Sequence, residues 1–186
     1  MASTISAGTT SGTAIAIAGD TSGNLAFTTQ AGANTISVPN ATGIMMVSGN
    51  MPAFSAYGTQ TLTTATTTKC VLNTKIFDTN SNFDAVTNYR FTPTIAGYYQ
   101  VNINHQYSAA GGAGGVCIGY IYKNGAQYTV PLYEFLDTNL TGTAASGSLL
   151  VQMNGTTDYL EIYAFQSSGL NQTIVSYFSG SLVRAA

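Results

Sequence analysis

The sequence predicts an all-β fold, and three observations lead to this class. Residues 99–107 alternate strictly between Tyr, Val, Ile or His and the amides Gln and Asn, as expected for a strand with one buried and one polar face. Asn-Gly pairs at 124–125 and 154–155 mark tight turns between strands. No segment has a convincing helical periodicity. The chain is therefore expected to consist of strands and turns.

The composition indicates a neutral protein suited to an assembly. Only 6% of the 186 residues are charged, whereas about 25% is usual in soluble domains. Thr, Ser, Asn, Gln and Gly supply the polar surface instead, and the 45% hydrophobic content is ample for a core. A net charge of −2 with only five Lys and Arg argues against nucleic-acid binding. The sequence suggests no cofactor.

Residues 1–50 differ in kind from the rest and are predicted to form an extended, β-rich N-terminal arm. Asp20 is their one charged side chain, so a secretory signal is not expected, and the apolar run at 14–18 is too short to cross a membrane. We therefore expect a soluble protein made in a cytoplasm.

The arm contains short apolar alternations separated by Gly, Asp and Asn, each too small to bury a face alone. Such segments acquire a core by wrapping with identical copies or by lying on another protein. The alternative is a disordered Gly, Ser and Thr tail, which the repeated apolar residues do not fit. The candidate anchoring residues are Ile15, Ile17, Leu25, Phe27, Ile36 and Val38.

Residues 51–186 form the predicted main domain. Its first strand is expected at 54–57, with a Thr-rich second strand at 59–68. Hairpins are expected where residues 116–123 turn into 126–133 and where 146–153 turn into 159–166, each around an Asn-Gly pair. The last strand is expected at 173–183. A glycine-rich loop at 109–115 has no Lys and no following helix, so it does not suggest a phosphate site.

The predicted strand at 159–166 is apolar on both faces. Leu160, Ile162 and Ala164 share one face, while Tyr163 and Phe165 share the other with Tyr159 and Glu161. A strand of a sandwich needs only one buried face. The second apolar face therefore predicts contact with another subunit.

The few side chains capable of chemistry do not form a catalytic pattern. His105 is the only histidine and lies in phase with apolar residues, which is typical of an interior or interface position. Cys70 and Cys117 do not define a disulfide framework and are expected to be small buried side chains rather than a bridge. No acid/base pair and no nucleophile elbow is evident, so we do not expect an enzyme.

One loop has oxygen-bearing side chains at alternate positions, as a calcium-binding loop would. They are Asp78, Asn80, Asn82 and Asp84. Two features disagree with an EF-hand: Phe83 stands where a sharp turn needs Gly, and Tyr89 stands where the bidentate Glu belongs. We therefore favour side chains that cap a turn, and expect no metal.

A family resemblance rests on the order Phe91, Pro93, Gly97, Tyr98, Tyr99 with Asn-Phe-Asp at 82–84 upstream. This order resembles the globular head of complement component one q, a jelly roll shared with tumour necrosis factor. Further pieces follow in the family's order at 76–78, 122–125, 149–155, 159–162 and 176–182. The resemblance covers roughly residues 52–183.

The resemblance implies a jelly-roll β-sandwich that forms a homotrimer. The residues that we assign to the trimer interface on this basis are Tyr99, His105, Tyr159, Tyr163, Phe165 and Phe178. Irregular glycine spacing in the arm excludes the collagen stalk that animal members often carry.

The phrase at 19–27, GDTSGNLAF, resembles segments of tailed-bacteriophage fibre and decoration proteins. The predicted function is therefore a non-enzymatic virion protein, a trimeric capsid decoration protein assembled in the host bacterial cytoplasm. Its expected partners are its own copies and the major capsid protein.

The main alternative is a tail-fibre tip that binds a host surface glycan through loops 109–115 and 137–145. A secreted complement-like adhesin is a third possibility, disfavoured by the missing signal and collagen repeat.

Overall fold

The structure, a computed structural model, describes residues 25–28, 35–38, 51–108, 115–136 and 142–186. None of these residues is helical, and accordingly no helix in the described part is long and apolar enough to cross a membrane. The contacts divide the chain into two units, residues 1–44 and 45–186. In the first unit, β1 (Leu25–Thr28) and β2 (Thr35–Val38) pair antiparallel, with Leu25 opposite Val38 and Phe27 opposite Ile36.

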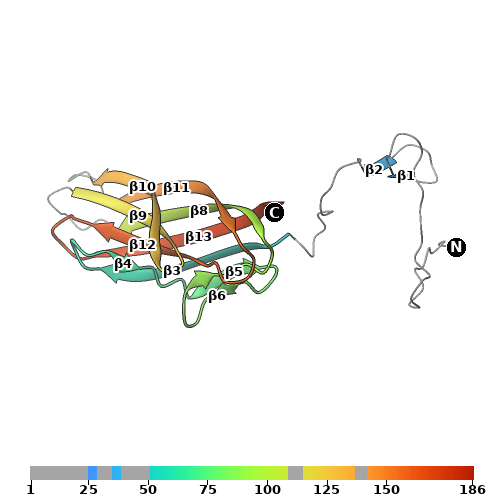
Figure 1. Cartoon of the computed structure of the whole chain (residues 1–186). Helices are drawn as coiled ribbons and strands as arrows, with labels where there is room; N and C mark the ends of the chain where they lie inside the picture. The colour runs from blue at the N-terminus through green and yellow to red at the C-terminus, as the bar shows by residue number, and fades with distance from the viewer. Residues whose placement is uncertain (1–24, 29–34, 39–50, 109–114, 137–141) are drawn as a thin grey trace. The chain divides into compact units, whose positions relative to one another are not determined.

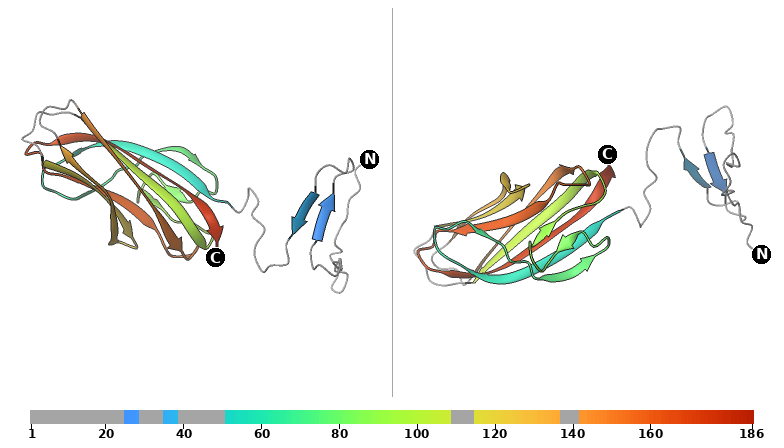
Figure 2. Two further views of the ribbon diagram at one scale, coloured as in Figure 1. Left: turned by 90° about the horizontal axis from the view of Figure 1, so that it is seen from above. Right: turned by 60° about the horizontal axis from the view of Figure 1, so that its bottom comes forward.

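The second unit is a sandwich of two antiparallel sheets packed face to face (Figures 1 and 2). The five-stranded sheet has the order β11 (Gly142–Met153), β8 (Gly97–Ser108), β13 (Gln172–Ala185), β3 (Ala53–Leu62) and β5 (Thr74–Asp78). The six-stranded sheet has the order β10 (Ala126–Leu136), β9 (Gly115–Lys123), β12 (Leu160–Gln166), β7 (Arg90–Phe91) and β6 (Phe83–Asp84), and β4 (Thr68–Lys69) also pairs with β12.

Strand β8 lies between β11 and β13 and has the alternation that the sequence predicts. Its inward side chains are each at most 4% exposed, while the amides between them face outward. The inward set is Tyr99, Val101, Ile103, His105 and Tyr107. A half-buried strand is therefore confirmed at this place, because burial of every second side chain fixes its register.

Aromatic rings from both sheets join at the centre of the core. Phe54 of β3 stacks on Phe91 of β7 at a centroid distance of 4.1 Å and meets the edge of Phe178 at 4.9 Å. Phe91 in turn meets Tyr99 edge to face at 5.5 Å. Such pairs add about 0.5–1.5 kcal/mol each beyond the burial of area, so this cluster holds the two sheets together.

The hairpin at Asn124-Gly125 is confirmed. It joins β9 to β10, and the φ angles of Asn124 and Gly125 are 56° and 79°, as a two-residue turn with two left-handed positions requires. Pairing in register with Ala126 opposite Lys123 follows directly from this turn.

Two other expectations about strands are wrong. The predicted hairpin at Asn154-Gly155 does not exist, because β11 pairs with β8 whereas β12 pairs with β9 in the other sheet. The turn instead carries the chain between sheets, and Asn154 Oδ1 holds it by accepting the N–H groups of Thr156, Thr157 and Asp158. The expected second strand at 59–68 is not a separate strand, since residues 59–62 continue β3, residues 63–67 lie outside the strands, and Thr68 begins β4.

Candidate interaction surfaces

The one histidine and the two cysteines of the chain lie in the core. The ring of His105 has no exposed surface, and its Nδ1 lies 2.9 Å from Ser176 Oγ. Burial lowers the pKa of His105 to about 4, although the backbone of Tyr163 opposes this shift. Burial also raises the pKa of both thiols, Cys70 and Cys117, to about 12. At neutral pH the imidazole is neutral and the thiols are protonated, so these groups behave as core side chains.

The two cysteines are free, as the sequence suggested. Cys70 donates its backbone N–H to Ile162 O of β12 at 2.9 Å, while Cys117 of β9 pairs with Gln166 on the other side of β12. One whole strand therefore separates them, which places their Cα atoms at least about 9 Å apart. A disulfide needs less than about 7 Å, so this fold does not allow the bridge.

The calcium candidate consists of two separate turns. Asp78 accepts the N–H groups of Asn82 and Phe83 at 2.9 and 3.0 Å. Asp84 accepts those of Val86, Thr87 and Asn88 in the next turn.

The backbone N–H groups of Thr87 and Val86 hold the pKa of Asp84 well below its usual range, because they stabilise the carboxylate. Within the described residues, no three His, Cys, Asp or Glu side chains are placed to share a metal ion. The two carboxylates act as turn caps, because their oxygens accept these backbone N–H groups.

The six residues expected at the trimer interface divide into two groups. Tyr99, His105 and Phe178 have no exposed surface in the single chain, because their strands face the opposite sheet. A side chain without exposed surface cannot contact a second copy, so these three are core residues. Tyr163 and Phe165 are half-buried on the outward face of β12, and Tyr159 is half-buried just before this strand.

The outward face of the six-stranded sheet is rich in tyrosine. Tyr122 of β9 stacks on Tyr163 at a centroid distance of 4.0 Å, and Tyr120 meets the edge of Tyr122 at 6.5 Å. Beside them Lys69 forms an ion pair with the buried Glu161. The sequence had placed Glu161 on an apolar face, and this ion pair explains how its charge is accommodated there.

Asp158 joins the two turns at the chain-entry end of the sandwich. It accepts hydrogen bonds from Asn124 Nδ2 at 2.7 Å and Asn154 N at 3.0 Å, and pairs with Lys123 Nζ at 2.9 Å. Burial opposes ionisation of this carboxyl, but the donors Asn124, Lys123 and Asn154 outweigh it and lower its pKa. These hydrogen bonds and this ion pair fix the β9–β10 hairpin to the turn at residues 154–158, which connects the two sheets.

The outward face formed by β11, β8, β13 and β3 of the five-stranded sheet is almost free of charge. In the described part of β11, β8, β13 and β3, Arg184 is the one charged side chain on this face. Tyr57 of β3 stacks on Tyr177 of β13 at 5.6 Å. We name this surface the neutral face.

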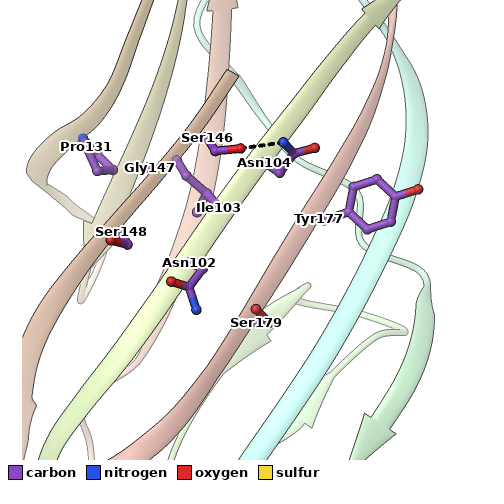
Figure 3. A pocket seen from close by; sticks show the side chains of 9 residues that line it. All are labelled: Asn102, Ile103, Asn104, Pro131, Ser146, Gly147, Ser148, Tyr177 and Ser179. Carbon is purple, nitrogen blue, oxygen red and sulfur yellow. Dashed lines mark hydrogen bonds between the residues drawn. The ribbon is translucent and has the colours of Figure 1, made fainter. Parts of the chain in front are cut away.

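The neutral face contains a hollow of about 570 Å³ (Figure 3). Asn104 Nδ2 of β8 donates to Ser146 Oγ of the neighbouring strand β11 at 2.6 Å, and Tyr177 of β13 is paired with Asn104 on its other side. Pro131 of β10 closes the edge, since its carbonyl oxygen approaches Gly147 of β11. The lining residues are Asn102, Ile103, Asn104, Pro131, Ser146, Gly147, Ser148, Tyr177 and Ser179.

Apolar side chains gather at the end of the neutral face where the chain enters β3. Leu150 lies opposite Gln100, which pairs with Ser181 and leads to Ala53 at the start of β3. The exposed apolar residues of this end are Met51, Phe77, Tyr98, Leu150 and Val183. An uncharged sheet face with an apolar end is the kind of surface that protein subunits cover.

The sequence analysis missed the neutral face. Its amides and hydroxyls looked like ordinary solvent-facing positions of β8, β11 and β13, and only the pairing of those strands gathers them on one surface. The low content of charged residues was the available signal, but composition alone does not show where on the surface an uncharged region lies.

The candidate anchoring residues lie in the first unit or outside the described residues. Leu25 and Phe27 are on β1, and Ile36 and Val38 are on β2. Ile15 and Ile17 lie outside the described residues, as do most of the loops expected to bind glycan, 109–114 and 137–141.

No family model matches the sequence, and a search of curated proteins finds no match. Solved structures do resemble the fold. The globular domain of zebrafish complement 1qA protein superposes with a TM-score of 0.54 at 17% identity, covering 73% of this chain and 99% of that one. The PRD1 vertex protein P5 gives a TM-score of 0.53 at 12% identity, covering 70% and 96%.

A third match is the tumour necrosis factor Eiger from S. frugiperda, with a TM-score of 0.50 at 7% identity, covering 73% of this chain and 95% of that one. The chain is thus an all-β sandwich that matches the jelly-roll folds of these three proteins. At these identities the likeness concerns the fold alone.

Proposed function

We propose that this protein is a non-enzymatic structural protein of a bacteriophage virion, a homotrimer that decorates the capsid. The neutral face carries the proposal of self-association: four adjacent strands present one charged side chain and a cluster of exposed apolar residues. Because almost no charged side chain would lose its water, the desolvation penalty for covering this surface is small. Burying its apolar end stabilises the complex by about 25 cal/mol per Å² of apolar surface buried.

A structural rather than catalytic role is supported by where the reactive groups lie. The only histidine and both cysteines are buried, and the thiols are protonated at neutral pH. Asp84 and Asp158 are occupied as acceptors within turns. An acid, base or nucleophile needs access to a substrate, and His105, Cys70 and Cys117 have none.

A role in the virion is supported by the fold of the vertex protein P5 and by the phrase at 19–27 that resembles phage fibre and decoration proteins. The low charge suits a protein packed among others. We place the protein in the virion, assembled in the host bacterial cytoplasm, with its own copies and the major capsid protein as partners.

Self-association is tested by placing a charge on the neutral face. Leu150 is 52% exposed on β11, so Leu150→Glu leaves the core intact but requires a buried carboxylate in any interface formed there. We expect light scattering to give a trimer for the native chain and monomers for this variant. Leu170→Glu, at a residue 46% exposed on a loop at the other end, is the matched control and should stay trimeric.

A monomeric native chain would overturn the trimer, and a trimeric Leu150→Glu variant would overturn the choice of face. The place in the virion is tested by copy number relative to the major capsid protein, measured by quantitative mass spectrometry of purified particles. Comparable abundance supports decoration of the head. A few copies per particle would instead support the tail-fibre tip.

A further inference from the structure

An exposed aromatic pair lies on β10, the edge strand of the six-stranded sheet. Tyr133 and Phe135 alternate on β10, are 56% and 72% exposed, and meet edge to face at a centroid distance of 5.6 Å with an interplanar angle of 76°. We name them the aromatic corner. Ile118 of β9, opposite Tyr133, and Phe165 of β12, opposite Ile118, are half-buried and form its floor.

The aromatic corner lies at the end of the sandwich opposite the chain entry. Phe135 pairs with Val116, whose carbonyl accepts Ser167 N–H at 3.1 Å directly after β12. Gln166 Nε2, at the same end of β12, donates to the carbonyl oxygen of Leu62, the last residue of β3. The last residue of β3 therefore lies at this end of the sandwich as well. Strand β3 has 10 residues, so about 30 Å separates this end from Ala53, and Figure 1 shows β10 ending at that side.

From this geometry we infer that the aromatic corner binds a saccharide by stacking of the sugar ring on Tyr133 and Phe135. The two rings, nearly perpendicular, present flat apolar surfaces to the C–H face of a pyranose. Tyr133 is 56% exposed and carries a hydroxyl that can donate to or accept from a sugar hydroxyl. The inference does not depend on whether the protein sits on the head or the tail.

The size of the corner favours a small ligand over a protein. The exposed parts of Tyr133 and Phe135 amount to on the order of 250 Å² of aromatic surface, since each such side chain covers 150–250 Å² when fully buried. A stable protein interface needs about 800 Å² from each partner. One or two sugar rings match the smaller area.

Charge and placement agree with a saccharide. The side chains that form the corner and its floor, Tyr133, Phe135, Ile118 and Phe165, are all uncharged, which suits a ligand of hydroxyls rather than a nucleic acid or a membrane surface. Within the sandwich, the corner lies at the end away from Ala53, and both of its rings are exposed there.

The test uses the full chain on an array of defined neutral and acidic oligosaccharides, followed by calorimetry with each oligosaccharide that binds. The double variant Tyr133→Ser, Phe135→Ser should bind at least about tenfold more weakly, because two stacking contacts are lost. The matched control is Ile76→Ser, Val86→Ser, which removes two side chains, on β5 and in the turn after β6, that are 58% and 82% exposed and belong to neither the corner nor the neutral face. It should bind as the native chain does.

Both variants change exposed residues, so equal thermal unfolding midpoints establish that the fold is intact. Native affinity in the Tyr133, Phe135 variant overturns the inference, as does a native chain that binds none of the oligosaccharides at millimolar concentration. Loss of capsid binding in the same variant, with no oligosaccharide bound by the native chain, would assign the corner to a protein partner instead. The trimer and the copy number are measured separately, so failure here leaves the proposed function standing.

Discussion

At the residue scale, the sequence predicted the burial of His105 correctly but assigned this side chain to the wrong environment, a subunit interface instead of the core. Its phase with Tyr99, Val101 and Ile103 placed it on the apolar face of a strand, and it is there. The interface role came from the resemblance, and the fold replaces it with a hydrogen bond to Ser176 inside one chain. A two-residue period cannot tell a subunit interface from a core, because both bury the same face.

His105 also makes the stability depend on pH. Its folded pKa of about 4 lies below the unfolded value of 6.5, so between these values the unfolded chain binds more protons. The stability that the neutral ring provides is therefore complete above pH 6.5 and is lost as the pH falls to 4. The full loss is about 3 kcal/mol of unfolding free energy.

Urea denaturation of native chain and His105→Gln between pH 7 and 4 measures this effect. The variant is expected to be less stable at pH 7 but to lose less stability on acidification. Asp84 and Asp158, whose pKa values are lowered, contribute to the acid loss in both chains, so the difference between the two profiles isolates the histidine. If the stability of both chains fell in parallel between pH 7 and 4, His105 would not be the source of the pH dependence.

At the element scale, the two Asn-Gly pairs show where local signals succeed and where they stop. Both pairs form turns with glycine at positive φ, as the sequence predicts. One turn joins neighbours in a sheet and the other joins strands of different sheets. Turn chemistry fixes the local backbone, whereas the destination of the next strand depends on which faces can be buried together.

Gly147 is the point at which β11 meets the edge of the other sheet. A Cβ at this position would lie 2.3 Å from the carbonyl oxygen of Pro131, which is backbone and cannot turn aside. Gly147→Ala should therefore force β10 away from β11 and destabilise the fold by about 1–3 kcal/mol.

Chemical denaturation checks this prediction against Ser148→Ala, the next residue, which points outward and should change stability by less than about 0.5 kcal/mol. Equal midpoints for the two variants would show that the close contact between β10 and β11 does not limit stability.

At the scale of the whole molecule, the chain divides into a first unit ending at Ile44 and a sandwich with its own core. We expect removal of residues 2–48 to leave the sandwich folded and trimeric, because the core residues found in the described part all lie between Phe54 and Leu182. The same deletion should abolish binding to purified capsids if residues 1–50 are the anchor. Sedimentation with capsids measures the binding, and retained binding would exclude the arm as the anchor.

The sequence by itself determined the all-β class, the buried face of β8 and the β9–β10 hairpin. These features depend on residues close together in the chain, where alternation and turn chemistry act directly. The tertiary structure alone decided which apolar side chains became core, which sheet received β12, and how the neutral face and the aromatic corner were gathered. Those outcomes arise from pairing between distant strands, and the period of two that marks a strand contains no information about its neighbour.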